Sequence, residues 1–124
     1  MILYLYTKCS TCQEALKFLE RKHVSFVRKE IVETPPSVEE LRRMLDYAEG
    51  HLKKLFNTSG QLYRQMELSE KLNAMSKEEA LFLLNQHGML IKRPFLIGDD
   101  VGLLGFKETE WSKKMELVQN RRLD

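Results

Sequence analysis

The sequence predicts a single α/β domain over residues 1–124, and three features of the chain support this fold class. A strand, a helix and a second strand follow one another within the first 32 residues. A hairpin and a final helix are predicted from residue 95 onward, and a helical insertion of about residues 35–88 separates these two parts. The length is that of one domain, and the 43% hydrophobic content is sufficient for a core.

The first strand is predicted at residues 1–6, an almost wholly apolar run that is typical of a strand buried on both faces. A helix follows, because apolar residues recur at three- and four-residue spacing from Cys12 to Leu19. The second strand is predicted from Val24 to Val32. Two strands joined by one helix form a βαβ unit, so these strands should be parallel.

Two capping boxes predict helices in the insertion: Ser37 with Glu40, and Ser76 with Glu79. In each pair a serine precedes a glutamate by three residues, and an apolar run follows. Three further residues are predicted to start or end helices: Ser69 as a start, and Gly50 and Gly88 as ends.

The hairpin is predicted from two apolar runs, Phe95–Ile97 and Val101–Phe106, which flank Gly98-Asp99-Asp100. The last helix is amphipathic, with Trp111, Met115 and Val118 on one face. No internal repeat or low-complexity stretch is present, which supports a single domain.

The charge is nearly balanced, with 20 basic and 18 acidic residues and a net charge of +2. The sequence has no stripe of basic residues, so direct DNA binding is not expected. The N-terminus lacks the pattern of a secretory signal, and no apolar run is long enough to span a membrane. We therefore expect a cytoplasmic protein that does not bind membranes.

The two cysteines, Cys9 and Cys12, lie where the first strand gives way to the first helix. The unpaired N–H groups and the dipole at a helix N-terminus favour an anion, and the reactive form of cysteine is the thiolate. Cys9 should lie exposed at the helix start with Lys8 beside it, and Cys12 one turn further in. The spacing predicts a redox pair in which Cys12 can resolve a mixed disulfide formed at Cys9.

Two other interpretations of the cysteines remain open. Half of a zinc site would need further ligands, and the three histidines have no ligand-like spacing, so no metal is expected. Inert packing suits Cys12 alone better than an N-terminal Cys9.

Four features together resemble the arsenate reductase (ArsC)/Spx family. They are Cys9-Ser10-Thr11-Cys12 after the first strand, an interrupted helical insertion, Lys92-Arg93-Pro94, and a late Gly105-Phe106. The resemblance covers essentially the whole chain and is greatest to the arsenate-reductase-related bacterial branch with a CxxC motif. It implies a thioredoxin-like fold of the glutaredoxin type, with a mixed four-stranded sheet, helices on both faces and the cysteine loop at one end.

The resemblance also implies roles for residues outside the cysteine motif. Pro94 matches the proline that is cis in thioredoxin-like folds and faces the redox cysteine. Arg93 matches the family arginine beside the cysteine, which helps to hold the oxyanion in arsenate reductases. The residues expected to contact substrate are Lys8, Ser10, Thr11, Asn57 and Pro94.

Departures from the family pattern affect the expected activity. Arsenate reductases of this family carry further arginines where this chain has Asn57-Thr58 and Gly105, so the oxyanion pocket should be depleted. Arg64 and Lys107 could replace them only if the fold aims both inward. These reductases also lack a cysteine at the position of Cys12 and use glutathione.

The leading functional hypothesis is a thiol–disulfide oxidoreductase in which Cys9 is the nucleophile, Cys12 the resolving thiol and Arg93 an electrostatic support. It would reduce arsenate weakly or not at all, or another oxidised substrate. The expected reductant is glutathione, glutaredoxin or thioredoxin. We expect no bound cofactor and a monomeric protein.

The alternative is a redox-sensing regulator of the Spx type, which binds the C-terminal domain of RNA polymerase α without catalysis. Spx proteins carry CxxC, and Gly50 matches part of their binding region. Spx proteins also carry an arginine near the position of Ser59, which is missing here. An inert scaffold is the third interpretation.

Overall fold

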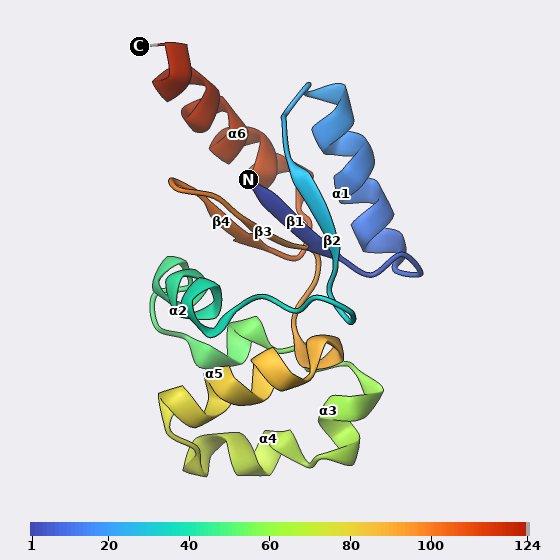
Figure 1. Cartoon of the computed structure of the whole chain (residues 1–124), viewed down its shortest axis with the longest axis vertical. Coiled ribbons are helices and arrows are strands. Elements are labelled where there is room, and N and C mark those ends of the chain that lie inside the picture. Colours follow the sequence, from blue (N-terminus) through green and yellow to red (C-terminus); the bar gives the residue numbers. More distant parts are fainter. Residues whose placement is uncertain (124) are drawn as a thin grey trace.

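The computed structural model describes the backbone of residues 1–123 and the side chains of residues 1–120. A four-stranded sheet lies at its centre (Figure 1), with the strands in the order β2 (Val27–Glu30), β1 (Ile2–Leu5), β3 (Phe95–Ile97) and β4 (Gly102–Leu104). β1 is parallel to β2 and antiparallel to β3, and β3 is antiparallel to β4. The predicted βαβ unit, hairpin and mixed sheet are therefore confirmed.

One face of the sheet is covered by α1 (Ser10–Arg21) and α6 (Glu108–Leu123), which lie together above the strands in Figure 1. Side chains of both helices pack on Leu3 and Leu5 of β1 and on the inward residues of the hairpin. Trp111 is fully buried here, and its indole N–H donates to the Gly105 carbonyl at 3.0 Å. This face carries Cys12 in its core.

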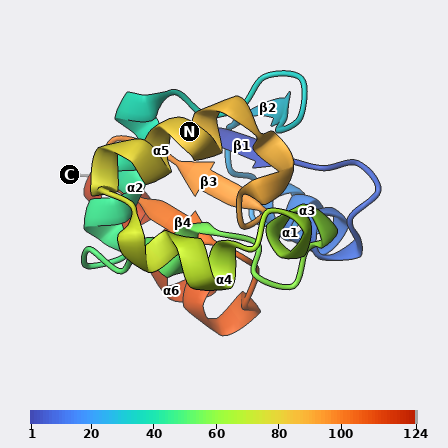
Figure 2. The ribbon, with the colours of Figure 1, turned by 90° about the horizontal axis from the view of Figure 1, so that it is seen from below.

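The opposite face is covered by the insertion, which contains four α-helices and three 3₁₀ turns. In order these are α2 (Val38–Tyr47), η1 (Leu52–Leu55), α3 (Gln61–Gln65), α4 (Leu68–Lys71), η2 (Leu72–Ala74), α5 (Lys77–Gln86) and η3 (Gly88–Leu90). Seen from below, they lie in front of the sheet (Figure 2). Both predicted capping boxes are present, at the starts of α2 and α5.

Several predicted boundaries differ from the structure. β1 spans Ile2–Leu5 within the predicted residues 1–6. β2 is shorter than the predicted Val24–Val32, because an edge strand pairs only with the four residues of β1. β4 likewise ends at Leu104 and not at Phe106. Ser69, the predicted start of a helix, lies inside α4. The residue before this helix, Glu67, has a left-handed backbone conformation.

Gly88 has a different role from the predicted one. It does not end α5 in a left-handed conformation but begins η3, after α5 has ended at Gln86. A Cβ at this position would lie 2.0 Å from the Ile31 carbonyl oxygen. Glycine is required because two backbone segments meet here, and this contact joins the insertion to the end of β2.

Candidate functional site

Cys9 is the N-cap residue of α1, and Cys12 lies three residues further on, in the first turn of the helix. Cys9 is half-buried, whereas Cys12 is completely buried in the core between α1 and the sheet. Both are free thiols. The strand-to-helix junction therefore places one thiol at the surface and one directly behind it.

The pKa values of the two thiols are shifted in opposite directions. Burial alone raises the pKa of Cys9, but the backbone N–H and thiol of Cys12, the Arg93 guanidinium and the backbone N–H of Thr11 lower it below its ordinary value. Burial, reinforced by the neighbouring Cys9 sulfur, raises the pKa of Cys12 to about 12. Cys9 is thus the thiol that ionises first.

Arg93 reaches the cysteines from the other end of the chain, immediately before β3. Its peptide bond to Pro94 is cis, as the resemblance implied. One terminal nitrogen of Arg93 donates to the Met89 carbonyl at 3.2 Å, and the guanidinium carbon lies 5.2 Å from the centre of the Tyr6 ring. The Nε of Arg93 is buried without a hydrogen-bond partner among the described residues.

The loop between β1 and α1 is held by its own hydrogen bonds. The Cys9 N–H donates to the Tyr6 carbonyl at 2.9 Å, and the Gln13 amide donates to the Thr7 carbonyl at 3.0 Å. The Thr7 hydroxyl donates to the Glu30 carboxylate at the end of β2. These bonds hold the reactive thiol in place on the sheet.

The other predicted contact residues lie around this centre at different depths. Ser10 and Lys8 are exposed, and the cation that acts on the Cys9 pKa is Arg93. Thr11 is half-buried with its N–H toward Cys9. The Asn57 N–H donates to the Leu90 carbonyl at 2.7 Å, so Asn57 flanks the segment that leads to Arg93.

The structure also describes the positions of the missing family arginines. Arg64 is exposed and donates to the Ser59 carbonyl at 3.0 Å, within its own loop. Gly105 has a left-handed φ of +67°, and a Cβ there would lie 3.2 Å from Cε of Lys92. Lys107 lines a cavity beside this glycine together with Lys92.

Sequence reasoning did not identify Tyr6 or Met89 as supports of Arg93. Tyr6 ends the apolar run of the first strand, and nothing local distinguishes it from a core aromatic residue. The Met89 contact uses a backbone carbonyl, which any residue would supply. Neither contact has a sequence signal.

Two general properties concern the described part of the chain. No helix there is both long and apolar enough to cross a membrane. No three histidine, cysteine, aspartate or glutamate side chains come together there as a metal site would require.

Comparison with known proteins places this geometry in context. The sequence model of the ArsC family matches residues 4–114. The uncharacterised protein YusI of Bacillus subtilis is 43% identical over 91% of this chain and 96% of its own. A solved structure from Streptococcus mutans, described as a possible arsenate reductase, superposes with a TM-score of 0.82 at 37% identity, covering 90% of this chain and 96% of that one. The global transcriptional regulator Spx of B. subtilis is 25% identical over 87% of this chain and 81% of its own length.

Proposed function

Because the chain belongs to the ArsC family, we propose that it is a thiol–disulfide oxidoreductase in which Cys9 is the nucleophile and Cys12 the resolving thiol. The observation that carries this proposal is the placement of two free thiols within the first turn of one helix, the first half-buried at the N-cap and the second enclosed in the core. Their pKa values are shifted in opposite directions, which agrees with this placement. The thiol of lower pKa is also the more accessible of the two. These are the properties of an attacking and a resolving cysteine.

The reaction proceeds in two exchanges. The Cys9 thiolate attacks one sulfur of a substrate disulfide; that S–S bond breaks, and one substrate thiolate leaves and takes up a proton. Cys12 then loses its proton and attacks the Cys9 sulfur, which releases the second substrate thiol and leaves a Cys9–Cys12 disulfide. An external thiol, such as glutathione, glutaredoxin or thioredoxin, supplies the two electrons that restore the dithiol.

The first exchange favours the second. The negative charge of the Cys9 sulfur is one reason why the pKa of Cys12 is raised. Once Cys9 is bound in a mixed disulfide, that charge is gone, and Cys12 loses its proton more easily. Arg93 remains beside both sulfurs and favours the second thiolate, as it did the first.

An assay of small-disulfide reduction tests the proposal. Hydroxyethyl disulfide is supplied with glutathione, glutathione reductase and NADPH, or with a thioredoxin system. Wild-type protein should consume NADPH, Cys9→Ser should be inactive, and Cys12→Ser should retain a mixed disulfide visible as added mass. Full activity of Cys9→Ser, or no turnover with either reducing system, would rule the proposal out.

A second candidate is a redox-dependent regulator that binds RNA polymerase α. It is supported by the similarity to Spx and by Gly50, which lies exposed after α2 with nothing within 4 Å of a Cβ built there. Pull-down of the purified C-terminal domain of RNA polymerase α by the reduced and oxidised protein distinguishes it. Binding without disulfide turnover would favour the regulator.

A further inference from the structure

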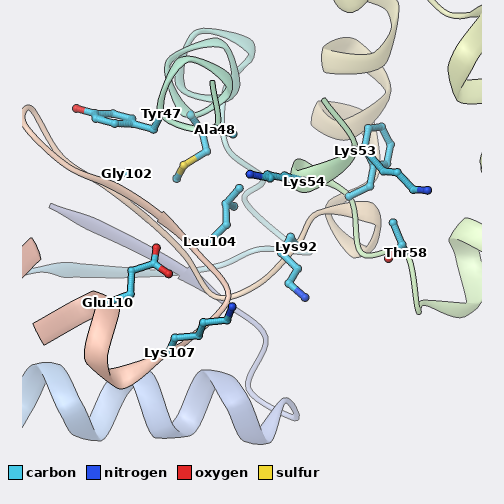
Figure 3. A pocket seen from close by; sticks show the side chains of 12 residues that line it. Tyr47, Ala48, Lys53, Lys54, Thr58, Lys92, Gly102, Leu104, Lys107 and Glu110 are labelled. Atoms are coloured by element: carbon cyan, nitrogen blue, oxygen red, sulfur yellow. The ribbon is translucent and has the colours of Figure 1, made fainter. Parts of the chain in front are cut away.

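A cavity of about 560 Å³ opens beside edge strand β4, between α2 and the start of α6 (Figure 3). Neither cysteine lines it, and Arg93 does not either. Its walls nevertheless adjoin the thiol site: Lys92 precedes Arg93, and Thr58 follows Asn57. A volume of this size is within the range of small-molecule sites in proteins.

The cavity is strongly basic. Four lysines line it, Lys53 and Lys54 from η1, Lys92 from the segment before β3, and Lys107 from the turn before α6. In Figure 3 the side chain of Lys107 points toward Lys92, Lys54 points toward the centre, and Lys53 points away. These cations come from three separate segments of the chain, so the tertiary fold has gathered them.

The lysines have no partners in the protein to offset their mutual repulsion. Among the described residues, none of the four forms a salt bridge within 4.0 Å. Glu110 is the only acidic residue of the lining. A bound anion with more than one negative charge would relieve the repulsion.

The rest of the lining indicates what accompanies the anion. Tyr47, Phe56 and Leu104 supply an apolar wall, while Thr58 and Glu110 can hydrogen-bond to hydroxyl or amino groups. The cavity contains lysine but no arginine. Lysine binds phosphate as a point charge.

We propose that this cavity is a binding site for a phosphorylated small molecule, with the phosphates held by Lys54, Lys92 and Lys107 and an attached ring on the apolar wall. A nucleoside diphosphate has this chemistry. Glu110, from α6, accepts a hydrogen bond from a hydroxyl or amino group of the ligand. The site is separate from the thiol pair and does not depend on thiol chemistry.

Titration calorimetry with ADP, pyrophosphate and adenosine tests the proposal on the full chain. ADP should bind more tightly than pyrophosphate, which lacks the ring, and adenosine, which lacks the phosphates, should bind weakest. Affinity for ADP should fall as sodium chloride is raised, because the lysines are exposed. No heat of binding from ADP or pyrophosphate at millimolar concentration would overturn the proposal, as would equal affinity for ADP and adenosine.

Charge-removing variants locate the site. The double variant Lys92→Gln/Lys107→Gln should weaken ADP binding by roughly 4- to 25-fold, since each exposed charged contact is worth roughly a factor of two to five. The control Lys17→Gln/Lys77→Gln removes the same charge from exposed positions on α1 and α5 and should leave affinity within about twofold. An equal loss in the control would show attraction by net charge and overturn the proposal.

Cys9→Ser separates this site from the proposed reductase. This variant should bind ADP as the wild type does, because Cys9 is not part of the cavity. Loss of ADP binding in Cys9→Ser would overturn the proposal that the phosphate site is separate from the thiols. If Cys9→Ser loses disulfide turnover but still binds ADP, the result supports a phosphate site that is independent of the thiols.

Discussion

Cys9 and Cys12 begin the same helix but lie in different surroundings. Helix N–H groups and Arg93 act on the half-buried Cys9, whereas Cys12 is enclosed by the core of α1 and the sheet. Accessibility and acidity therefore favour the same residue as the attacking group. The different roles proposed for the two thiols rest on a separation of three residues along one helix.

Alkylation should distinguish the two thiols. In iodoacetamide labelling followed by mass spectrometry, Cys9 should react much faster than Cys12 at pH 7. The midpoint of its rate profile should lie below the pH of about 8.5 at which an ordinary thiol is half ionised. Cys12, whose pKa is raised to about 12, should remain mostly unlabelled until the protein unfolds. Cys9→Ser and Cys12→Ser assign each rate, and equal rates at pH 7 would contradict the assignment.

The thiolate form of Cys9 should depend on Arg93. Arg93→Ala removes a positive charge that lowers the Cys9 pKa, so the pKa should rise and alkylation at pH 7 should slow by roughly threefold or more. Arg64→Ala is the matched control, because Arg64 is exposed and donates to the Ser59 carbonyl. The alkylation rate as a function of pH measures both. An unchanged pH profile in Arg93→Ala would show that Arg93 does not act on the Cys9 thiol.

Among the elements, the insertion depends on a close backbone contact as well as on its helices. The capping boxes of α2 and α5 satisfy free N–H groups within each helix, and this pattern is visible in the sequence. Gly88, by contrast, allows η3 to approach the Ile31 backbone, and only the arrangement of distant segments reveals this contact. Docking of the insertion on the sheet depends on that position.

Gly88→Ala should therefore be strongly destabilising. A Cβ placed 2.0 Å from a carbonyl oxygen forces backbone movement, and we expect a loss of about 3 kcal/mol in the free energy of unfolding, measured in urea. Gly50→Ala is the control, because its Cβ meets nothing within 4 Å and only the positive φ of 79° adds a penalty of about 1 kcal/mol. Similar losses in both variants would show that the contact at Ile31 is unimportant.

On the scale of the whole molecule, the fold brings Arg93 to the thiols but does not replace the two missing family arginines. Arg64 is engaged in its own loop, and Gly105 has a left-handed conformation that an arginine would adopt only with strain. Lys107 faces the cavity beside β4. The groups that act on Cys9 as positive charge or N–H donors are thus Arg93 and the start of α1.

Arsenate reduction should be weak for this reason. Each lost charged hydrogen bond is worth roughly 1.5–3 kcal/mol, so two missing arginines weaken arsenate binding by about two to four orders of magnitude. Turnover with arsenate, glutathione and glutaredoxin should be near background, while disulfide turnover by the same preparation is normal. Cys9→Ser gives the background rate. A kcat/KM close to that of a dedicated reductase assayed in parallel would show that other groups replace the arginines.

The sequence by itself determined the features that depend on local pattern: the strand and helix order, both capping boxes, and the position of Cys9 and Cys12 at a helix start. Each follows from residues within about one helical turn of one another. The resemblance to the family added the mixed sheet and the cis bond before Pro94.

Only the tertiary structure decided how distant segments meet. It buries Cys12 in the core, places Arg93 over Tyr6, brings Gly88 against Ile31, and gathers Lys54, Lys92 and Lys107 around one cavity. Burial, charge proximity and steric contact depend on separations in space, and these residues are far apart along the chain. For that reason the cysteine pair and the more reactive of its two thiols could be recognised in advance, whereas the contacts that hold Arg93 and the basic cavity beside it could not.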